Sequence, residues 1–207
     1  MNNIKLSNTL SYWVFNFDIS NLDKILDISN QVITAGDGKY DGFGIWEGYK
    51  DIRDITKLNV PYLSDLAVSG MTMCDEIFSK EYKNILSNIW VNLVKTNNPT
   101  QSINREPGKY IYHTHTEISK ELGQPNPDYT FVFYLQTPNN LKGDDGKLFI
   151  KDKDGSEYSI LPKVGECIIL NGDTPHAPLN APDSEFDRIV LAGNVVFSNP
   201  KANLTLF

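Results

Sequence analysis

The second half of the chain, after Pro107, is a series of short apolar segments separated by turn-forming residues. Gly, Pro, Asn and Asp stand between these segments, and Asp154-Gly155 is a strong signal for a hairpin turn. Short strands joined by tight turns favour an antiparallel β structure over an alternating α/β fold. The segments, rich in β-branched and aromatic residues, predict strands at 109–117, 129–136, 146–151, 156–160, 166–171 and 188–197.

The first half of the chain adds helices to this pattern. Residues 12–17 predict an opening strand, and the apolar stripe from Asp18 to about Thr34 predicts a helix. A turn-dense stretch follows at 36–48. From Asp75 to about Thr96, apolar residues recur at three- and four-residue intervals, which predicts a long amphipathic helix. Helices first and strands afterwards fit an antiparallel β core with helices packed on one face.

Length and charge exclude several classes of protein. At 207 residues the chain can bury a substantial core as a single domain, in which we expect residues 1–106 to support a β core at 107–207. A net charge of −7 disfavours a nucleic-acid partner. The sequence shows no signal peptide and no apolar run of membrane-spanning length, and two cysteines are too few for a disulfide scaffold. We therefore expect a cytoplasmic location.

The three histidines of the chain occur at two places in the β-rich half. His113 and His115 lie with Glu117 in one predicted strand, where alternation would put all three side chains on one face. His176 follows the predicted strand 166–171 and a Gly-Asp-Thr-Pro turn. Two imidazoles and one carboxylate, with open positions opposite, are the ligands of mononuclear non-haem iron sites. The pattern predicts a metal site; a polar strand rim and a backbone-bonded turn histidine are the alternatives.

Arg188 stands at the head of an apolar run that should be a buried strand. A buried charge without a partner is costly, so the guanidinium needs an anion nearby. The planar group matches a carboxylate with two parallel hydrogen bonds. That carboxylate could belong to a bound dicarboxylate such as 2-oxoglutarate, or to Asp183, Asp187 or a more distant acid of the chain itself.

Residues 107–197 resemble, in motif order and approximate spacing, the prolyl-4-hydroxylase-like branch of the 2-oxoglutarate/Fe(II) oxygenases. Tyr112 to Glu117 is similar to that family's Tyr-x-x-His-x-Asp strand, with Glu in place of Asp. Residues 130–136 resemble its next apolar strand, and Gly146-Lys-Leu-Phe resembles its Gly-Gly-x-Leu hairpin. The end of the family's pattern corresponds to Pro162-x-x-Gly165, His176 and Arg188.

The resemblance implies a mainly β fold, a double-stranded β-helix (jelly-roll) core braced by the N-terminal helices. It also implies an Fe(II)- and 2-oxoglutarate-dependent dioxygenase. Such an enzyme would hydroxylate a C–H bond of a peptidyl residue or a small molecule and release succinate and carbon dioxide.

The resemblance further assigns roles to individual residues. Iron would be held by His115, Glu117 and His176, while Arg188 and Tyr112 would bind 2-oxoglutarate and dioxygen would take the remaining position. His113 departs from the family's pattern and could compete for the metal or hydrogen-bond to its ligands. Tyr134 and Thr174 are further residues expected around the ligands.

Two other functions remain open. A cupin-type protein would hold its metal with three histidines, His113, His115 and His176, and the spacing of His176 and Asn180 is similar to the second cupin motif. That alternative leaves Arg188 without a role. A non-catalytic binding or sensing domain could keep the same fold and a carboxylate pocket.

Overall fold

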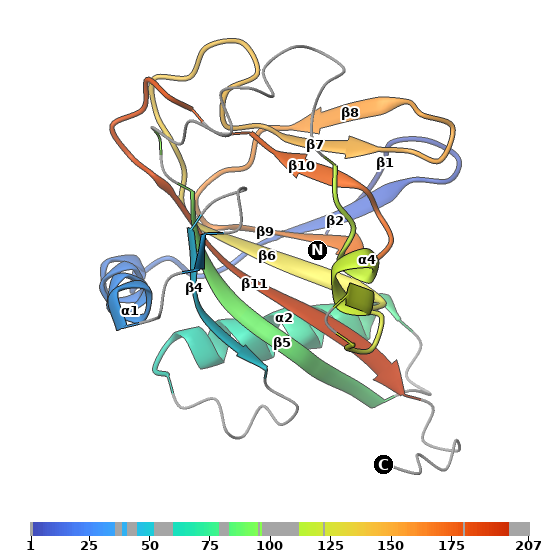
Figure 1. Ribbon diagram of the computed structural model, residues 1–207, viewed down its shortest axis with the longest axis horizontal. Helices are drawn as coiled ribbons and strands as arrows, with labels where there is room; N and C mark the ends of the chain where they lie inside the picture. The colour runs from blue at the N-terminus through green and yellow to red at the C-terminus, as the bar shows by residue number, and fades with distance from the viewer. Residues whose placement is uncertain are drawn as a thin grey trace.

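The structure is a computed structural model, and it describes residues 2–35, 39–40, 45–51, 60–78, 83–94, 96, 112–121, 123–179 and 181–198. Within these ranges the chain forms two antiparallel sheets and three helices (Figure 1). The helices are α1 (Leu22–Ala35), α2 (Leu63–Ile77) and α4 (His115–Glu121). None of them combines the length and the apolar character that a membrane crossing requires.

The major sheet is eight-stranded, in the order β1-β2-β9-β6-β11-β5-β4-β3, and the minor sheet has the order β10-β7-β8. Strands from the two halves of the chain are interleaved in the major sheet, so both halves build it. The major-sheet strands are β1 (Asn2–Lys5), β2 (Ser11–Asn16), β3 (Lys39–Tyr40), β4 (Ile45–Asp51), β5 (Lys83–Val94), β6 (Tyr129–Gln136), β9 (Glu166–Asn171) and β11 (Arg188–Ser198). The minor-sheet strands are β7 (Leu148–Lys151), β8 (Glu157–Ile160) and β10 (His176–Pro178).

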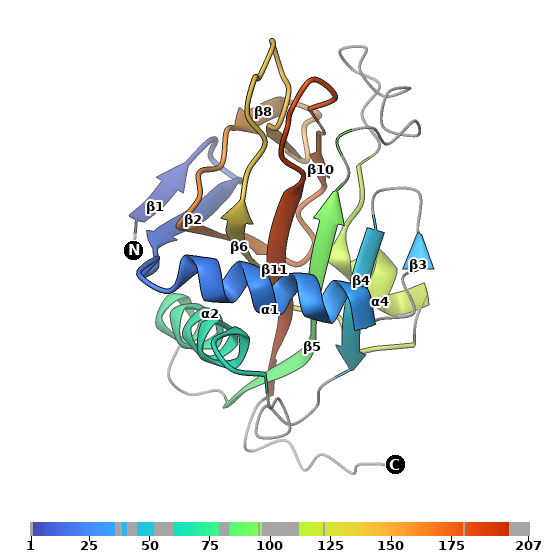
Figure 2. The same cartoon turned by 90° about the vertical axis from the view of Figure 1, so that its left-hand side faces the viewer.

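The two faces of the major sheet have different partners. Helices α1 and α2 lie across one face, and the minor sheet and α4 lie over the other (Figures 1 and 2). Along β11, Ile189 and Leu191 belong to the core beneath the helices, whereas Val190 belongs to the core between the sheets. Because side chains alternate along a strand, Arg188 and Asn194 share the face of Val190. The space between the sheets is therefore where polar groups of β11 can meet other elements.

Two glycines make room for one aromatic ring in the core. Phe131 of β6 is fully buried, and its ring lies between Gly70 of α2 and Gly193 of β11. A Cβ atom would lie 2.7 Å from the ring at Gly70 and 2.3 Å from it at Gly193. Any larger residue at either position must displace the ring, so α2 packs on the sheet only because both positions are glycine.

Most of the predicted elements are confirmed. The predicted strands 129–136 and 166–171 have the observed bounds, and 146–151, 156–160 and 188–197 differ from β7, β8 and β11 only at their ends. The predicted first helix corresponds to α1, and the predicted double-stranded β-helix with helices on one face is the observed fold class.

The predicted helix from Asp75 to Thr96 is wrong. Helix α2 ends at Ile77, and residues 83–94 form β5, which pairs with β4 and β11. Ile89, Val91 and Leu93 alternate along β5 and pack beneath the helices. The apolar residues fit a period of two as well as a helical period, and pairing on both edges of the strand decided between them.

The predicted strand 109–117 is also wrong over the part that the structure describes. Only His113 pairs, in an isolated bridge with His176, and α4 begins at His115. Residues 109–111 lie outside the described residues, as does most of the predicted turn region at 36–48.

Candidate functional site

The three histidines meet between the two sheets. His113 and His176 exchange two backbone hydrogen bonds, of 3.1 and 3.0 Å, so their side chains are carried by neighbouring segments. His115 is the first residue of α4 and is buried, as is His176. Each ring contributes a nitrogen to a group whose ligand atoms all lie within 4.8 Å of one another. This arrangement can hold one metal ion after a small closure of the rings, because cis nitrogens on such an ion are about 3 Å apart at ligand distances near 2 Å.

Hydrogen bonds set the tautomers of two of these rings. Nδ1 of His115 lies 2.7 Å from Oδ1 of Asn194, and Nδ1 of His176 lies 2.9 Å from the backbone carbonyl oxygen of Thr174. Both partners are acceptors, so each Nδ1 carries the proton and donates. The lone pair of each ring is then on Nε2, the usual arrangement for a histidine that binds a metal through that atom.

Burial keeps the three imidazoles neutral. Desolvation lowers the pKa of His115 to about 3, with His176 adding a smaller effect. The pKa of His176 is lowered by burial, and the pKa of His113 is lowered well below its ordinary value by burial and by the other two rings. Neutral imidazole is the form that binds metals, so the cluster is in its ligand form at neutral pH.

Glu117 is not part of this cluster. Its side chain is exposed, and Oε2 accepts a 2.9 Å hydrogen bond from the hydroxyl of Thr114. The Thr114 hydroxyl in turn accepts from the backbone N–H of Glu117 at 3.1 Å. Thr114 and Glu117 thus stand as N-cap and third residue of α4, a pairing related to the capping box. The motif Thr-x-x-Glu, visible in the sequence, is the signal that could have predicted a helix start here.

Arg188 is buried at the start of β11, with 4% of its surface exposed. Both terminal nitrogens, Nη1 and Nη2, are buried without a hydrogen bond to any residue that the structure describes. The two acids considered as partners are engaged elsewhere: Asp187 accepts from the backbone N–H of Thr96, and Asp183 pairs with Lys142 at 2.7 Å. Burial lowers the pKa of Arg188. An inward guanidinium of this kind requires an anion that the described chain does not supply.

The other predicted residues lie around the histidine cluster and Arg188. Tyr134 is buried in the core between the sheets, where burial raises its pKa to about 12 while the charge of Arg188 opposes the rise. Tyr112 packs on Phe149 of the minor sheet and its neighbours. Thr174 is buried and contributes its carbonyl to His176. The structure therefore places Tyr134 beside Arg188 and Thr174 beside a histidine.

Three residues at the histidine cluster were not predicted from the sequence: Asn194 and Trp90, which contact His115, and Thr130, which contacts Asn194. Asn194 and Thr130 form a buried pair in which the threonine hydroxyl donates to Oδ1 of Asn194 at 2.8 Å. The ring of Trp90 stacks on His115 with centroids 5.5 Å apart. A single Asn inside the apolar run 188–197 was the available signal, because buried polar groups need partners. Trp90 was not predicted because residues 83–94, which form β5, were predicted to be helical.

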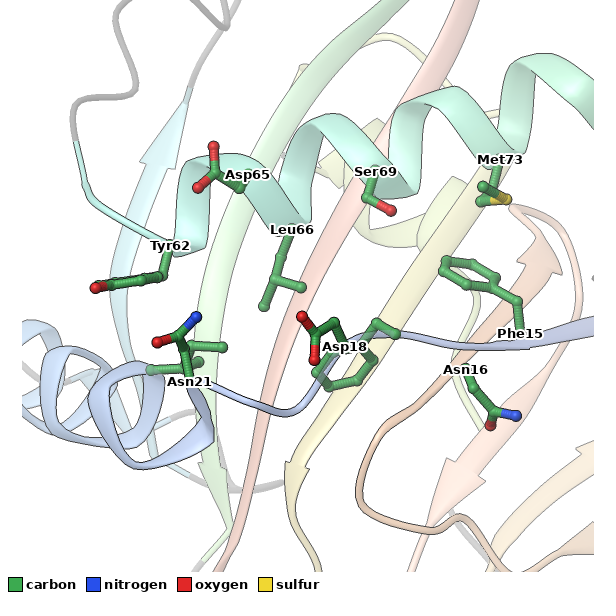
Figure 3. A pocket seen from close by; sticks show the side chains of 11 residues that line it. Phe15, Asn16, Asp18, Asn21, Tyr62, Asp65, Leu66, Ser69 and Met73 are labelled. Atoms are coloured by element: carbon green, nitrogen blue, oxygen red, sulfur yellow. The ribbon is translucent and has the colours of Figure 1, made fainter.

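A separate pocket lies on the helix-covered side of the major sheet. It has a volume of about 390 Å³ and is lined by the end of β2, the start of α1 and residues of α2 from Asp65 to Met73. Figure 3 shows Asp18 and Asp65 at this pocket with Tyr62 and Met73, and no histidine lines it. The pocket is therefore separate from the histidine cluster between the sheets.

No protein-family model and no curated protein matches the sequence. Several solved structures do match this fold. One is an oxidoreductase of the 2OG-Fe(II) oxygenase family from Burkholderia pseudomallei, at 11% identity and TM-score 0.61, covering 91% of this chain and 85% of that one. Another is a Pseudomonas putida prolyl-4-hydroxylase, at 14% identity and TM-score 0.56, covering 89% and 91%.

A third solved structure is the epimerase SnoN from nogalamycin biosynthesis, in complex with Fe³⁺, alpha-ketoglutarate and nogalamycin RO. It is 12% identical with TM-score 0.61, covering 89% of this chain and 78% of that one. Likeness at such low identity shows a shared fold, and it confirms at the level of fold the resemblance to 2-oxoglutarate/Fe(II) oxygenases.

Proposed function

We propose that this protein is an Fe(II)- and 2-oxoglutarate-dependent dioxygenase. The observation that carries the proposal is Arg188, a buried guanidinium whose terminal nitrogens find no partner among the described residues. It lies on the same face of β11 as Asn194, which contacts the histidine cluster. A buried guanidinium on the same sheet face as a histidine cluster suits an anion that reaches from a metal to an arginine, and 2-oxoglutarate has a carboxylate at each end.

Individual residues would divide the work. His115 and His176, which belong to both ligand sets considered from the sequence, would hold the iron with a third side chain. Arg188 would bind the far carboxylate of 2-oxoglutarate through parallel hydrogen bonds. Asn194 and the carbonyl of Thr174 would keep Nε2 of the two ligands free of a proton. The buried setting would exclude bulk water from the reacting centre.

Bound iron would supply the difficult chemistry, the use of dioxygen and 2-oxoglutarate to oxidise an unreactive C–H bond with release of succinate and carbon dioxide. The substrate class we propose is a peptidyl residue or a small molecule. Proteins of the same fold include a prolyl-4-hydroxylase and an epimerase of nogalamycin biosynthesis, which makes both classes compatible with this architecture.

Anaerobic visible absorption tests the proposal. The apoprotein is titrated with Fe(II) and then with 2-oxoglutarate; a weak charge-transfer band should appear only when both are present. With Arg188→Met, the same band should need at least ~10-fold more 2-oxoglutarate, and Arg188→Lys should recover only part of the loss because it lacks the planar fork. Fe(II) binding with no band at any 2-oxoglutarate concentration would contradict the proposal.

The cupin-type alternative is less well supported. It accounts for three histidines but leaves the buried Arg188 without a purpose, and the reported solved structures that share the fold are oxygenases and a related epimerase. Succinate release in air with Fe(II) and 2-oxoglutarate, even without a substrate, would separate an enzyme from a non-catalytic binding domain.

A further inference from the structure

We infer that the metal centre is carried by three neutral imidazoles, with His113 as the third ligand, and that the dianionic co-substrate supplies its counter-charge. Metal and 2-oxoglutarate should therefore bind cooperatively, each strengthening the other. The inference rests on the proposed function for the identity of the anion, and on the geometry of the histidines for the ligand set.

The position of His113 favours it over Glu117 as the third ligand. The backbone of His113 exchanges two hydrogen bonds with the backbone of His176. The ring centroid of His113 lies 4.4 Å from that of His176. One of its ring nitrogens belongs to the group of three histidine ligand atoms that all lie within 4.8 Å of one another.

In the structure the first turn of α4 holds the Glu117 carboxylate away from this group, hydrogen-bonded to Thr114. That turn is held by the Thr114 cap and by a 3.1 Å hydrogen bond from the N–H of Thr116 to the carbonyl of Gly172. Gly172 is itself closely packed, since a Cβ there would lie 2.0 Å from the carbonyl oxygen of Pro127, and its N–H donates to the carbonyl of Asp128 at 2.9 Å. The tight packing of this turn keeps the Glu117 carboxylate outside the cluster.

The charges between the sheets are unbalanced without a bound anion. An imidazole that binds a metal does so as an uncharged group, so the three of them leave the charge of a divalent ion uncompensated. The buried guanidinium of Arg188 adds another positive charge. Among the described residues the buried acids are Asp145 and Asp152, and the half-buried Glu166 lies near Tyr134. Glu166 accepts from the backbone N–H of Lys163. Asp145 accepts from the backbone N–H of Lys142, and Asp152 accepts from Thr9 at 2.8 Å and from Ser7.

Buried uncompensated cations are unfavourable, so a metal ion that enters this space alone should be held less tightly than one that enters with an anion. A dianion that contacts both the ion and Arg188 removes the imbalance. Because coupling between two binding events is reciprocal, the metal must increase the affinity for 2-oxoglutarate by the same factor.

Calorimetric titration of the full-length apoprotein with Co(II), with and without saturating 2-oxoglutarate, tests the inference. We expect 2-oxoglutarate to tighten Co(II) binding by at least ~10-fold, within the usual range of such couplings. His113→Ala should weaken Co(II) binding at least ~10-fold, whereas Glu117→Gln, the matched control, should change it less than about twofold. His113→Asp places a carboxylate in the centre and should raise Co(II) affinity without 2-oxoglutarate while reducing the coupling.

A second measurement does not depend on variants that fold poorly. Pulsed electron paramagnetic resonance of the Cu(II)-loaded wild type counts the imidazoles bound to the ion, and three are expected. Two imidazoles, or a loss of Co(II) affinity in Glu117→Gln with none in His113→Ala, would overturn the ligand set while the proposed function stands. Equal Co(II) affinity with and without 2-oxoglutarate would overturn the coupling. Three imidazoles without any charge-transfer band would contradict the proposed function and leave the ligand set intact.

Discussion

Oδ1 of Asn194 lies 2.7 Å from Nδ1 of His115 and also accepts from Thr130, so one amide oxygen joins β11, β6 and the start of α4. The contact is buried on every side, where a hydrogen bond is stronger than in water. It gives His115 a defined tautomer and a defined ring position before any metal arrives.

Replacing Asn194 should therefore weaken metal binding. We expect Asn194→Leu to reduce Co(II) affinity by about 10- to 100-fold, because the ring loses its acceptor and its orientation. Asn194→Asp keeps an acceptor and should retain most of the affinity. Thr130→Val is the control, since it removes the other donor to Asn194 without touching His115. Equal losses in Thr130→Val and Asn194→Leu, measured by calorimetry on folded protein, would show that the contact has no specific role.

Removing the charge of Arg188 should not destabilise the apoprotein. The guanidinium is buried without partners for its terminal nitrogens, so Arg188→Met should leave the free energy of unfolding unchanged or raise it. Urea unfolding of the apoprotein measures this effect. A destabilisation of more than ~3 kcal/mol, the usual result of breaking a buried ion pair, would mean that Arg188 has an anionic partner within the chain.

Enlarging either glycine beside Phe131 should destabilise the fold. A methyl group at Gly193 or Gly70 would overlap the ring, and overpacking of this kind costs about 1–3 kcal/mol. Phe131→Leu should partly rescue Gly193→Ala, because the smaller side chain frees the space. Strict additivity of the two substitutions in urea unfolding would show that the ring and the glycine do not constrain each other.

Acid should destabilise the apoprotein over a defined range. The unfolded chain binds a proton at each histidine near pH 6.5, whereas folded His115 does so only near pH 3. The unfolded state therefore binds more protons between these values, and stability falls as the pH falls, by about 1.4 kcal/mol per pH unit for His115. His113 and His176, whose pKa values are also lowered, add to the effect.

Urea unfolding of the apoprotein at pH 7.5, 6 and 5 measures this dependence. His115→Gln should show a shallower dependence, as it lacks one of the three groups. The same slope in both proteins would mean that His115 is protonated as readily in the folded state as in the unfolded state.

Five strands after residue 128, β6, β7, β8, β9 and β11, were predictable because each is an apolar segment between turn residues, and local chemistry decides where such a strand ends. The short strand β10 was not predicted, since it exists only through its pairing with β7. Nor was the strand at 83–94 predicted. Its apolar residues satisfy a helical stripe and a strand alternation equally well, and β4 and β11, on either side of it, are distant in sequence.

The sequence by itself determined which side chains are available for chemistry: three histidines in two segments, and one arginine at the head of a buried strand. Tertiary structure decided how they are grouped. Capping of α4 by Thr114 turns Glu117 outward, and pairing of His113 with His176 brings a third imidazole inward. Both outcomes depend on where the backbone changes from the β-bridge at His113 to the helix that begins at His115. Strand alternation would have put Glu117 on the face of His113 and His115, whereas the helical turn that begins at His115 points it away. A contact with a distant segment, from the N–H of Thr116 to the carbonyl of Gly172, supports that turn.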